Sequence, residues 1–264
     1  MATAHAQLAK IFVASTGNDA SDGSRGAPKR NFQAAHNAVA AGGQIVVLDT
    51  AGYGRLSINK SVAITVPPGV NAFVTALPGN NGINIDAGTN TVSLRGLIVE
   101  GGHDSAGILA FNVGSLSIED CTVRNFDRGI YVINFTALKF YLANTVVRGC
   151  ATAGLDFETG TDVAISGVAT DCHFDQQSGI AVLAKSSGAS SSVDLTLGDC
   201  VMSGNGTGVK SDGSTAIVRL DNCSVTSNGT GTTTANGGGL FSRVNNTIEH
   251  NSAGDTAPVA YSAK

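Results

Sequence analysis

Charged residues are scarce in this sequence, which also has no tryptophan and few aromatic residues of any kind. Asp, Glu, Lys and Arg make up 14% of the 264 residues, about half of the ~25% that is usual in soluble proteins. So few charges exclude a long charged helix or coiled coil, and 42% hydrophobic residues exclude a disordered chain. The polar surface must come from Asn, Ser, Thr and 34 glycines, which predicts many short strands joined by turns.

Long apolar runs and basic clusters are also missing. No run approaches the ~18 apolar residues that would span a bilayer, and the longest basic cluster is Lys29-Arg30. The formal net charge of -4 gives no basic surface for nucleic-acid phosphates. We expect neither a membrane nor a nucleic acid as a partner.

The first seven residues, Met-Ala-Thr-Ala-His-Ala-Gln, are similar to the small-residue end of a secretory signal peptide, with an Ala4-x-Ala6 cleavage pattern before Gln7. The apolar core of such a signal is missing, so a native start or a tag remnant is an equal alternative. The signal-peptide interpretation of residues 1–7 predicts a secreted or periplasmic protein.

A repeat runs through the chain with a period of roughly 25 residues, which lies within the range of solenoid proteins. Segments of the form Gly-apolar-x-small/apolar recur at similar intervals and begin at Gly82, Gly107, Gly129, Gly154, Gly179 and Gly208. Gly231 and Gly254 continue the series at two equal further intervals. A second repeated pattern runs in phase with the first, as Ile118–Val123, Leu142–Val147, Leu197–Met202 and Leu220–Val225 align without gaps.

Each repeat holds three short runs of alternating apolar residues, and none is long enough for a helix. Stacked repeats of this kind form a solenoid in which each strand pairs with its equivalent one coil later. The sequence therefore predicts an all-β fold, a parallel β-helix of about nine coils, forming a single domain over residues 8–264. A leucine-rich repeat has a similar period, but its Leu-x-x-Leu-x-Leu frame is absent.

One helix is predicted near the N-terminus, over residues 31–42. Asn31 is a candidate N-cap, Phe32, Ala35 and Val39 share one face, and Gly42-Gly43 would end the helix. Because a solenoid needs its open end covered, we expect this helix to cap the N-terminal coil.

The chain resembles the right-handed parallel β-helix proteins of the pectin lyase-like superfamily, in particular secreted bacterial members. The resemblance includes residues Ile11–Asp19, Phe32–Val39 and Gly43–Leu48, which are similar to an entry strand, a capping helix and a first coil. It implies a polysaccharide ligand lying across the first strand of successive coils. The Asn-Thr-Asp, Asp-Asp and Gly-His-Gly set of polygalacturonases, the Arg-x-Pro-x-x-Arg motif of pectate lyases and the Asp-Pro-His motif of mannuronan epimerases are all absent, so the resemblance implies no specific activity.

The outward residues of these strands follow from alternation, with Ile130 and Val132 inside the helix. One predicted outer row is Asn84, Leu109, Tyr131, Asp156, Ala181, Lys210 and Thr233. A second row is Asp86, Phe111, Ile133, Glu158, Leu183, Asp212 and Ala235, and Arg128 stands at the turn before the Tyr131 strand.

These rows predict a site in which Asp156 and Glu158 are the acid and the base or nucleophile of glycoside hydrolysis. Phe111 and Tyr131 would bind the ligand, with Arg128 and Lys210 at the margins; a polysaccharide lyase would use one of these two cations as its base. We expect an uncharged glycan to stack on Tyr131, because an acidic one would also need a bound cation. The alternative is a structural or surface β-helix whose apolar patch, Leu109, Phe111, Tyr131 and Ile133, is an oligomer or partner interface.

Two further sets of residues recur at fixed positions of the repeat. Four cysteines share one position and are predicted to be free, buried thiols: Cys121, Cys172, Cys200 and Cys223. The preceding position is acidic or amide in six repeats and predicts a turn ladder: Asp120, Asn144, Asp171, Asp199, Asn222 and Asn245. Asp171 and Asp199 could share a proton or a cation, but no metal site or cofactor is otherwise indicated.

Overall fold

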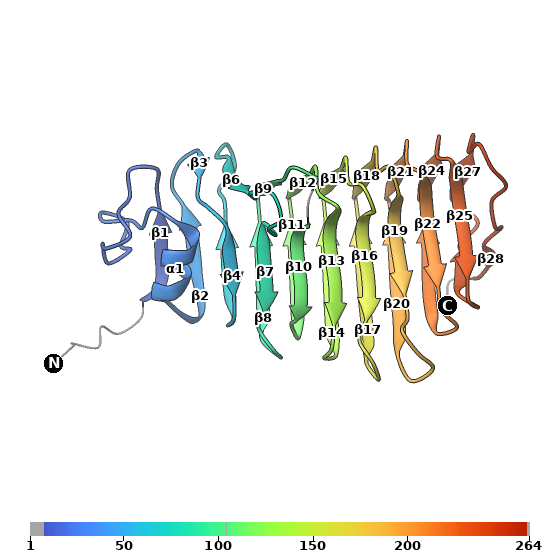
Figure 1. Ribbon diagram of the computed structural model, residues 1–264, viewed down its shortest axis with the longest axis horizontal. Helices are drawn as coiled ribbons and strands as arrows, with labels where there is room; N and C mark the ends of the chain where they lie inside the picture. Colours follow the sequence, from blue (N-terminus) through green and yellow to red (C-terminus); the bar gives the residue numbers. More distant parts are fainter. Residues whose placement is uncertain (1–7, 104, 263–264) are drawn as a thin grey trace.

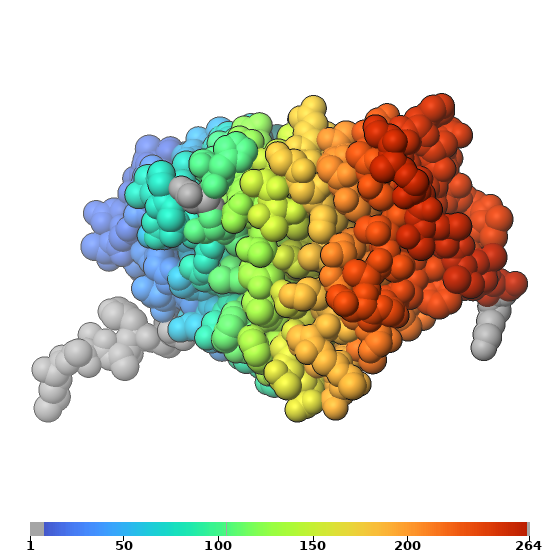
Figure 2. Space-filling view, turned by 45° about the vertical axis from the view of Figure 1, so that its right-hand side comes forward, coloured from blue at the N-terminus to red at the C-terminus, as the bar shows by residue number. Residues whose placement is uncertain are grey.

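The computed structural model describes residues 8–103 and 105–262 and shows three parallel β-sheets wound into one helix (Figure 1). In each coil the chain passes through sheet A, then sheet B, then sheet C, and every strand pairs with its equivalent in the neighbouring coils. The predicted right-handed parallel β-helix is confirmed. Figure 2 shows the coils following one another along the long axis in the order of the sequence.

The strands are short throughout. Sheet A holds β1 (Leu8–Val13), β2 (Val39–Val47), β5 (Val62–Thr65), β8 (Thr91–Arg95), β11 (Ser115–Glu119), β14 (Leu138–Ala143), β17 (Ala164–Thr170), β20 (Ser192–Gly198), β23 (Ala216–Asp221), β26 (Gly239–Ser242) and β28 (Val259–Ala260). Sheet B holds β3 (Ala51–Gly52), β6 (Ala72–Thr75), β9 (Leu97–Glu100), β12 (Thr122–Arg124), β15 (Val146–Arg148), β18 (His173–Asp175), β21 (Val201–Ser203), β24 (Ser224–Thr226) and β27 (Thr247–Glu249). Sheet C holds β4 (Leu56–Ile58), β7 (Ile83–Asp86), β10 (Ala106–Asn112), β13 (Arg128–Asn134), β16 (Ala153–Thr159), β19 (Ile180–Lys185), β22 (Thr207–Asp212) and β25 (Thr230–Ala235).

Within the described residues, eight coils contribute a strand to all three sheets, and β26 and β27 begin a further coil. The predicted number of about nine is therefore close.

The core is a set of apolar stacks, one layer for each coil. In sheet C one such stack is fully buried and consists of Ile108, Ile130, Leu155, Val182 and Val209. Neighbouring layers lie one strand spacing apart, about 4.8 Å, so a residue repeated at one position contacts its equivalents above and below. This explains why Ile130 and Val132 face inward, as predicted.

The repeated cysteines occupy one of these stacks. Cys121, Cys172, Cys200 and Cys223 are buried and free, which confirms the prediction, and Cys150 is a further buried free thiol. The four repeated cysteines stand directly after the A-to-B turn, whereas Cys150 follows the sheet B strand β15.

The acidic and amide ladder lies at that turn. Its first five members have positive φ angles: Asp120 (54°), Asn144 (45°), Asp171 (54°), Asp199 (51°) and Asn222 (52°). Asp and Asn tolerate this left-handed conformation better than other side chains, so the repeat selects them. The last repeat differs, because Val244 has the positive φ there and Asn245 does not. The Asn245 side chain donates a hydrogen bond to Asp221.

The N-terminal helix, α1, spans Phe32–Ala38 and packs beside β1, β2 and β4 (Figure 1). The predicted end at residue 42 is wrong, because Val39 is extended and begins β2, where it pairs with Leu8. Gly43 lies within that strand, and a Cβ there would lie 2.7 Å from the carbonyl oxygen of Ala9. Asn31 precedes the helix without capping it, since its amide donates to the Asp19 carboxylate instead.

The predicted signal-peptide remnant, residues 1–7, lies outside the described residues. In the part of the chain that is described, no helix combines the length and the apolar character required to cross a membrane.

Candidate functional site

The predicted site residues stand on the outer face of sheet C, where strand pairing fixes their register. One outward row pairs Leu109, Tyr131, Asp156, Leu183 and Lys210 in successive coils. The row two residues further along the strands pairs Ile133, Glu158, Lys185 and Asp212. Tyr131 on β13 and the two carboxylates on β16, Asp156 and Glu158, therefore lie on adjacent strands. Lys210 lies on β22, two strands away from β16.

The predicted register is wrong by two residues in β19. Ala181 was expected to face outward but is fully buried, and Leu183 takes its place in the first row. The reason is that Gly154 pairs in register with Ala181 and not with Gly179, because Leu155 pairs with Val182. Gly179 divides the stretch from residue 154 to residue 208 unevenly, whereas Ala181 lies at its midpoint. This regularity is the signal that identifies Lys185 as a member of the second row.

Arg128 connects Asp156 with Tyr131. Its Nε atom lies 2.7 Å from Oδ2 of Asp156, and its Cζ atom lies 4.7 Å from the centre of the Tyr131 ring. The guanidinium thus covers a face of the ring in a cation–π contact. A sugar cannot stack on that face of Tyr131 while Arg128 keeps this position.

Asp156 is buried, with 3% of the residue exposed, so the expectation that it faces solvent is wrong. Alternation predicts its direction correctly, but Arg128 and Tyr131 shield it from water. Its Oδ1 atom is buried and has no hydrogen-bond partner among the described residues. Burial raises the pKa of the Asp156 carboxyl, and the hydrogen bond from Arg128 offsets only part of this effect. Burial and the charge of Glu158 raise the pKa of Tyr131 to about 12.

Glu158 lies between Tyr131 and Lys185. One carboxylate oxygen is 2.7 Å from Nζ of Lys185, and the other accepts a hydrogen bond of 3.3 Å from the Tyr131 hydroxyl. The hydrogen bond between Lys185 and Glu158 raises the pKa of Lys185. Lys210, predicted at the margin of the site, lies 2.9 Å from Asp212 on its own strand and lowers the pKa of Asp212 by hydrogen bonding.

An exposed aromatic pair stands next to these charges. Phe111 at the end of β10 and Phe135 just after β13 have ring centres 5.0 Å apart, and they are 42% and 44% exposed. Phe135 reaches this position because residue 160 on the next coil is a glycine, whose absent Cβ would lie 2.2 Å from the Phe135 ring. Phe111 was predicted from the sequence and Phe135 was not, because it follows the strand and has no place in the alternation.

A polar hollow of about 490 Å³ continues this edge beyond Lys185. It is lined by Lys185, Asp212 and Asn236 and by the turns that follow β19 and β22. We refer to the edge formed by Phe111, Phe135, Glu158, Lys185 and Asp212 as the sheet C track. It follows the carboxyl ends of five consecutive strands, β10 to β22.

Asp156 and Glu158 could serve as a carboxylate pair. They lie two residues apart on one face of a strand, so their Cα atoms are about 6.7 Å apart. Inverting glycosidases hold their two carboxyl groups about 6.5–9.5 Å apart. A raised pKa suits a general acid. A ligand can reach the Asp156 carboxyl only if the Arg128 side chain moves.

No arrangement of three or more His, Cys, Asp or Glu side chains that could hold a metal ion occurs among the described residues. Asp171 and Asp199 have neighbouring partners instead: Thr170 donates to Asp171, and Asn222 donates to Asp199.

Comparisons with known proteins give one structural likeness. No protein-family model and no curated protein sequence matches this chain. A solved structure of a rhamnogalacturonan lyase aligns over 96% of this chain with 11% sequence identity and a TM-score of 0.30. The chain spans 65% of the length of that lyase chain.

Proposed function

We propose that the sheet C track binds a polysaccharide. The observation that carries the proposal is the exposed pair of Phe111 and Phe135, which adjoins the Glu158–Lys185 ion pair and a polar hollow along one open edge. The edge presents a new side chain at each coil, about every 4.8 Å. Such an extended, stepwise surface suits a repeating polymer better than a compact small molecule.

The chemistry of the track suits a glycan. Aromatic rings pack against the C–H faces of sugars, and charged side chains that are already paired can exchange hydrogen bonds with hydroxyl groups. Glu158 pairs with Lys185, and Asp212 pairs with Lys210, so the track carries no surplus of either sign. This balance favours an uncharged polymer. We place this function outside the cytoplasm, in line with the pattern in residues 1–7.

Affinity electrophoresis through gels that contain xylan, glucomannan or galactan tests the proposal. A Phe111→Ser, Phe135→Ser double variant should lose at least tenfold in affinity for the retarding polymer. Tyr141→Ser is the matched control, because Tyr141 is 42% exposed on sheet A, away from the track. Equal retardation of the wild type and the double variant would rule out the track as the binding surface.

The raised pKa of Asp156 supports hydrolysis as a further activity of this face. In this proposal Asp156 protonates the leaving oxygen after Arg128 moves aside, and Glu158 activates a water molecule. Release of reducing ends from the retarding polymer is the assay. Asp156→Asn and Glu158→Gln should each abolish it, and Asp156→Asn, which lies outside the sheet C track, should leave the retardation in place. Unchanged release in either variant would exclude that residue from catalysis.

Assembly is the second candidate function, and the exposure of Phe111 and Phe135 favours it. In this case Leu109, Phe111, Tyr131 and Ile133 would contact another copy or a partner protein. Light scattering at low micromolar concentration distinguishes the two functions. A dimer that the Phe111→Ser, Phe135→Ser variant converts to a monomer, with no polymer bound by either form, would establish assembly.

A further inference from the structure

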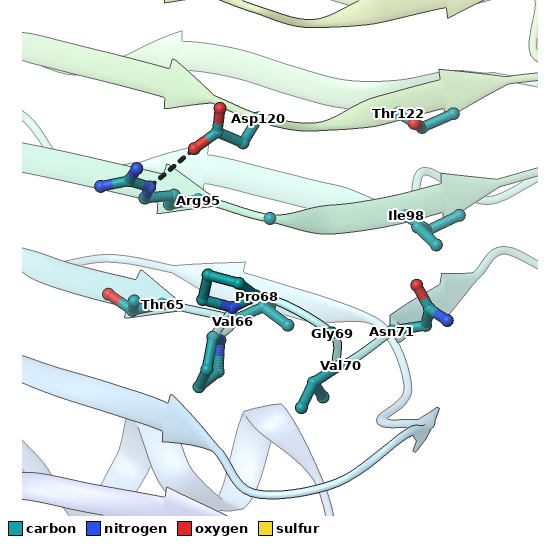
Figure 3. Close-up of a pocket in the computed structure, with 12 residues that line it drawn as sticks. Thr65, Val66, Pro68, Gly69, Val70, Asn71, Arg95, Ile98, Asp120 and Thr122 are labelled. Carbon is teal, nitrogen blue, oxygen red and sulfur yellow. Dashed lines mark hydrogen bonds and ion pairs between the residues drawn. The ribbon is translucent and has the colours of Figure 1, made fainter.

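A second hollow lies at the corner between sheets A and B, away from the sheet C track. This corner groove has a volume of about 710 Å³, which is within the usual range of 300–1,000 Å³ for ligand pockets. Figure 3 shows Arg95 and Asp120 at the ends of two neighbouring strands, Ile98 and Thr122 further along the same coils, and the loop with Pro68 and Val70 opposite them.

The groove exists because one corner loop is longer than those that follow. Six residues, 66–71, connect β5 to β6, whereas Gly96 alone connects β8 to β9. The long loop stands out from the stack and forms a wall beside the tighter corners. Gly96 has a φ of 79°, and a Cβ there would lie 2.9 Å from Cβ of Val66, so the loop lies directly against this glycine.

The polar side of the groove is a fixed ion pair. Nε of Arg95 lies 2.7 Å from Oδ2 of Asp120, and the Asn144 amide donates a 2.8 Å hydrogen bond to the other carboxylate oxygen. The hydrogen bond from Asn144 lowers the pKa of Asp120, with Arg95 adding to the effect, so the carboxyl stays ionised. Both side chains are well exposed, and the terminal nitrogens of Arg95 have no partner in the described parts of the chain.

The other side of the groove is largely apolar. Pro67, Pro68 and Val70 form the wall, and Ile98 projects from β9 on the neighbouring coil. Thr122 adds a hydroxyl at the far end. A ligand in the groove would therefore meet carbon atoms on one side and, on the other, a guanidinium donor beside a carboxylate acceptor.

We propose that the corner groove is a second ligand site, which binds a neutral saccharide. The charges of Arg95 and Asp120 cancel, so the groove offers no net attraction to an ion of either sign. Adjacent hydroxyls each donate and accept hydrogen bonds, and two of them match the neighbouring donor and acceptor of this pair. The C–H face of a sugar ring matches the proline wall. The site shares no residue with the sheet C track and does not depend on it.

Titration of ¹⁵N-labelled protein with cellohexaose and xylohexaose, followed through backbone amide shifts, tests this site. At least one of the two should shift amides in residues 65–71, 95–98 and 120–122. Arg95→Ala should weaken that binding at least tenfold. Arg148→Ala is the matched control, because Arg148 is an exposed arginine in an equivalent ion pair with Asp175 on sheet B.

Two results would overturn the inference. One is that neither sugar shifts the groove amides, including the case in which the sheet C amides alone respond. The other is unchanged affinity in an Arg95→Ala protein whose melting temperature matches that of the wild type. Hexagalacturonate, an acidic comparator, should bind the groove at least tenfold more weakly than the better neutral sugar, and tighter binding would reject the neutral class.

Discussion

The Arg128 guanidinium and the Asp156 carboxylate connect β13 and β16 through a 2.7 Å contact in which the two partners have very different surroundings. The Arg128 side chain is 36% exposed, and that of Asp156 is 4% exposed. The arginine can therefore keep water on its outer edge, whereas the carboxylate gives up its hydration. The hydrogen bond from Arg128 does not fully compensate for the hydration that the carboxylate loses on burial, so the pKa of Asp156 stays raised.

Asp156→Asn should therefore change how stability depends on pH. The folded-state pKa is above the unfolded value of 3.8, so Asp156 stabilises the fold at low pH, and this contribution is lost as pH rises through the folded-state pKa. The Asn variant lacks this loss. We expect its free energy of unfolding, relative to the wild type, to improve as pH rises from 4 to 7. Urea unfolding at several pH values measures it.

Asp120→Asn is the control of opposite sign. Hydrogen bonds from Asn144 and Arg95 lower the pKa of Asp120, so its contribution is present above pH 3.8 and is lost as pH falls. This variant should lose stability relative to the wild type at neutral pH and not at low pH. Parallel pH curves for Asp156→Asn and the wild type would show that Asp156 does not titrate abnormally.

The fold could be predicted because a solenoid repeats its physical constraints in every coil. Most coils place an apolar side chain at the level of Ile130 and a residue that tolerates positive φ at the level of Asp120, so both patterns recur in the sequence. The predicted register of β19 is wrong because Gly179 resembles the repeated glycine without standing at its position. A small residue is sufficient at that position, and Ala181 provides it.

The site could be predicted only in part, because alternation gives the direction of a side chain and not its exposure. Tyr131, Asp156 and Glu158 lie on one face, as predicted. The burial of Asp156 depends on where the long side chain of Arg128 lies, and the position of Phe135 depends on a glycine one coil away. Neither follows from the period of the repeat.

The cysteines should be unreactive in the folded protein. Burial raises the pKa of Cys121 to about 12 and that of Cys150 to about 11. Hydrogen bonding with Cys200 lowers the pKa of Cys172 and Cys223, but these thiols are also buried, so the reagent cannot reach them in the folded protein. Ellman's reagent without reductant should label no thiol in native protein and five after denaturation in guanidinium. Fewer than five, with a mass lowered by two hydrogens for each pair, would show disulfides.

His36 should make the N-terminal coil sensitive to acid. The side chain lies on the buried face of α1, and burial, together with the charge of Lys60, lowers its pKa below 6.5. The unfolded chain then takes up a proton that the folded chain does not, so stability is lost as pH falls below about 6.5. His36→Leu should remove this loss, and amide exchange of α1 and β2 at pH 5 and pH 7 measures it. Equal acid sensitivity in the variant would assign the effect to other groups.

Asn228 should stabilise the interior strongly, because its side-chain amide forms hydrogen bonds to the preceding coil and, through Asn251, to the following coil. The residue is 1% exposed. Its oxygen accepts hydrogen bonds from the backbone and side chain of Asn205, and its nitrogen donates to the carbonyl of Met202 at 3.0 Å. Asn228→Ala leaves buried donors and an acceptor unpaired, at about 1–3 kcal/mol each. We expect a loss of roughly 3 kcal/mol in the free energy of unfolding.

Asn222→Gly is the matched control for this prediction, since Asn222 belongs to the same coil, is exposed at its turn and has a positive φ that glycine accommodates. Its side chain donates one hydrogen bond, to Asp199, and water can replace that partner, so the loss should stay near 1 kcal/mol or below. Both asparagines begin an Asn-x-Ser/Thr sequence. Of these two asparagines, Asn222 alone should accept a glycan on the folded protein in a glycosylating host, because an enzyme cannot reach the Asn228 amide in the core. Similar losses of stability in the two variants, or a glycan on folded Asn228, would contradict the buried ladder.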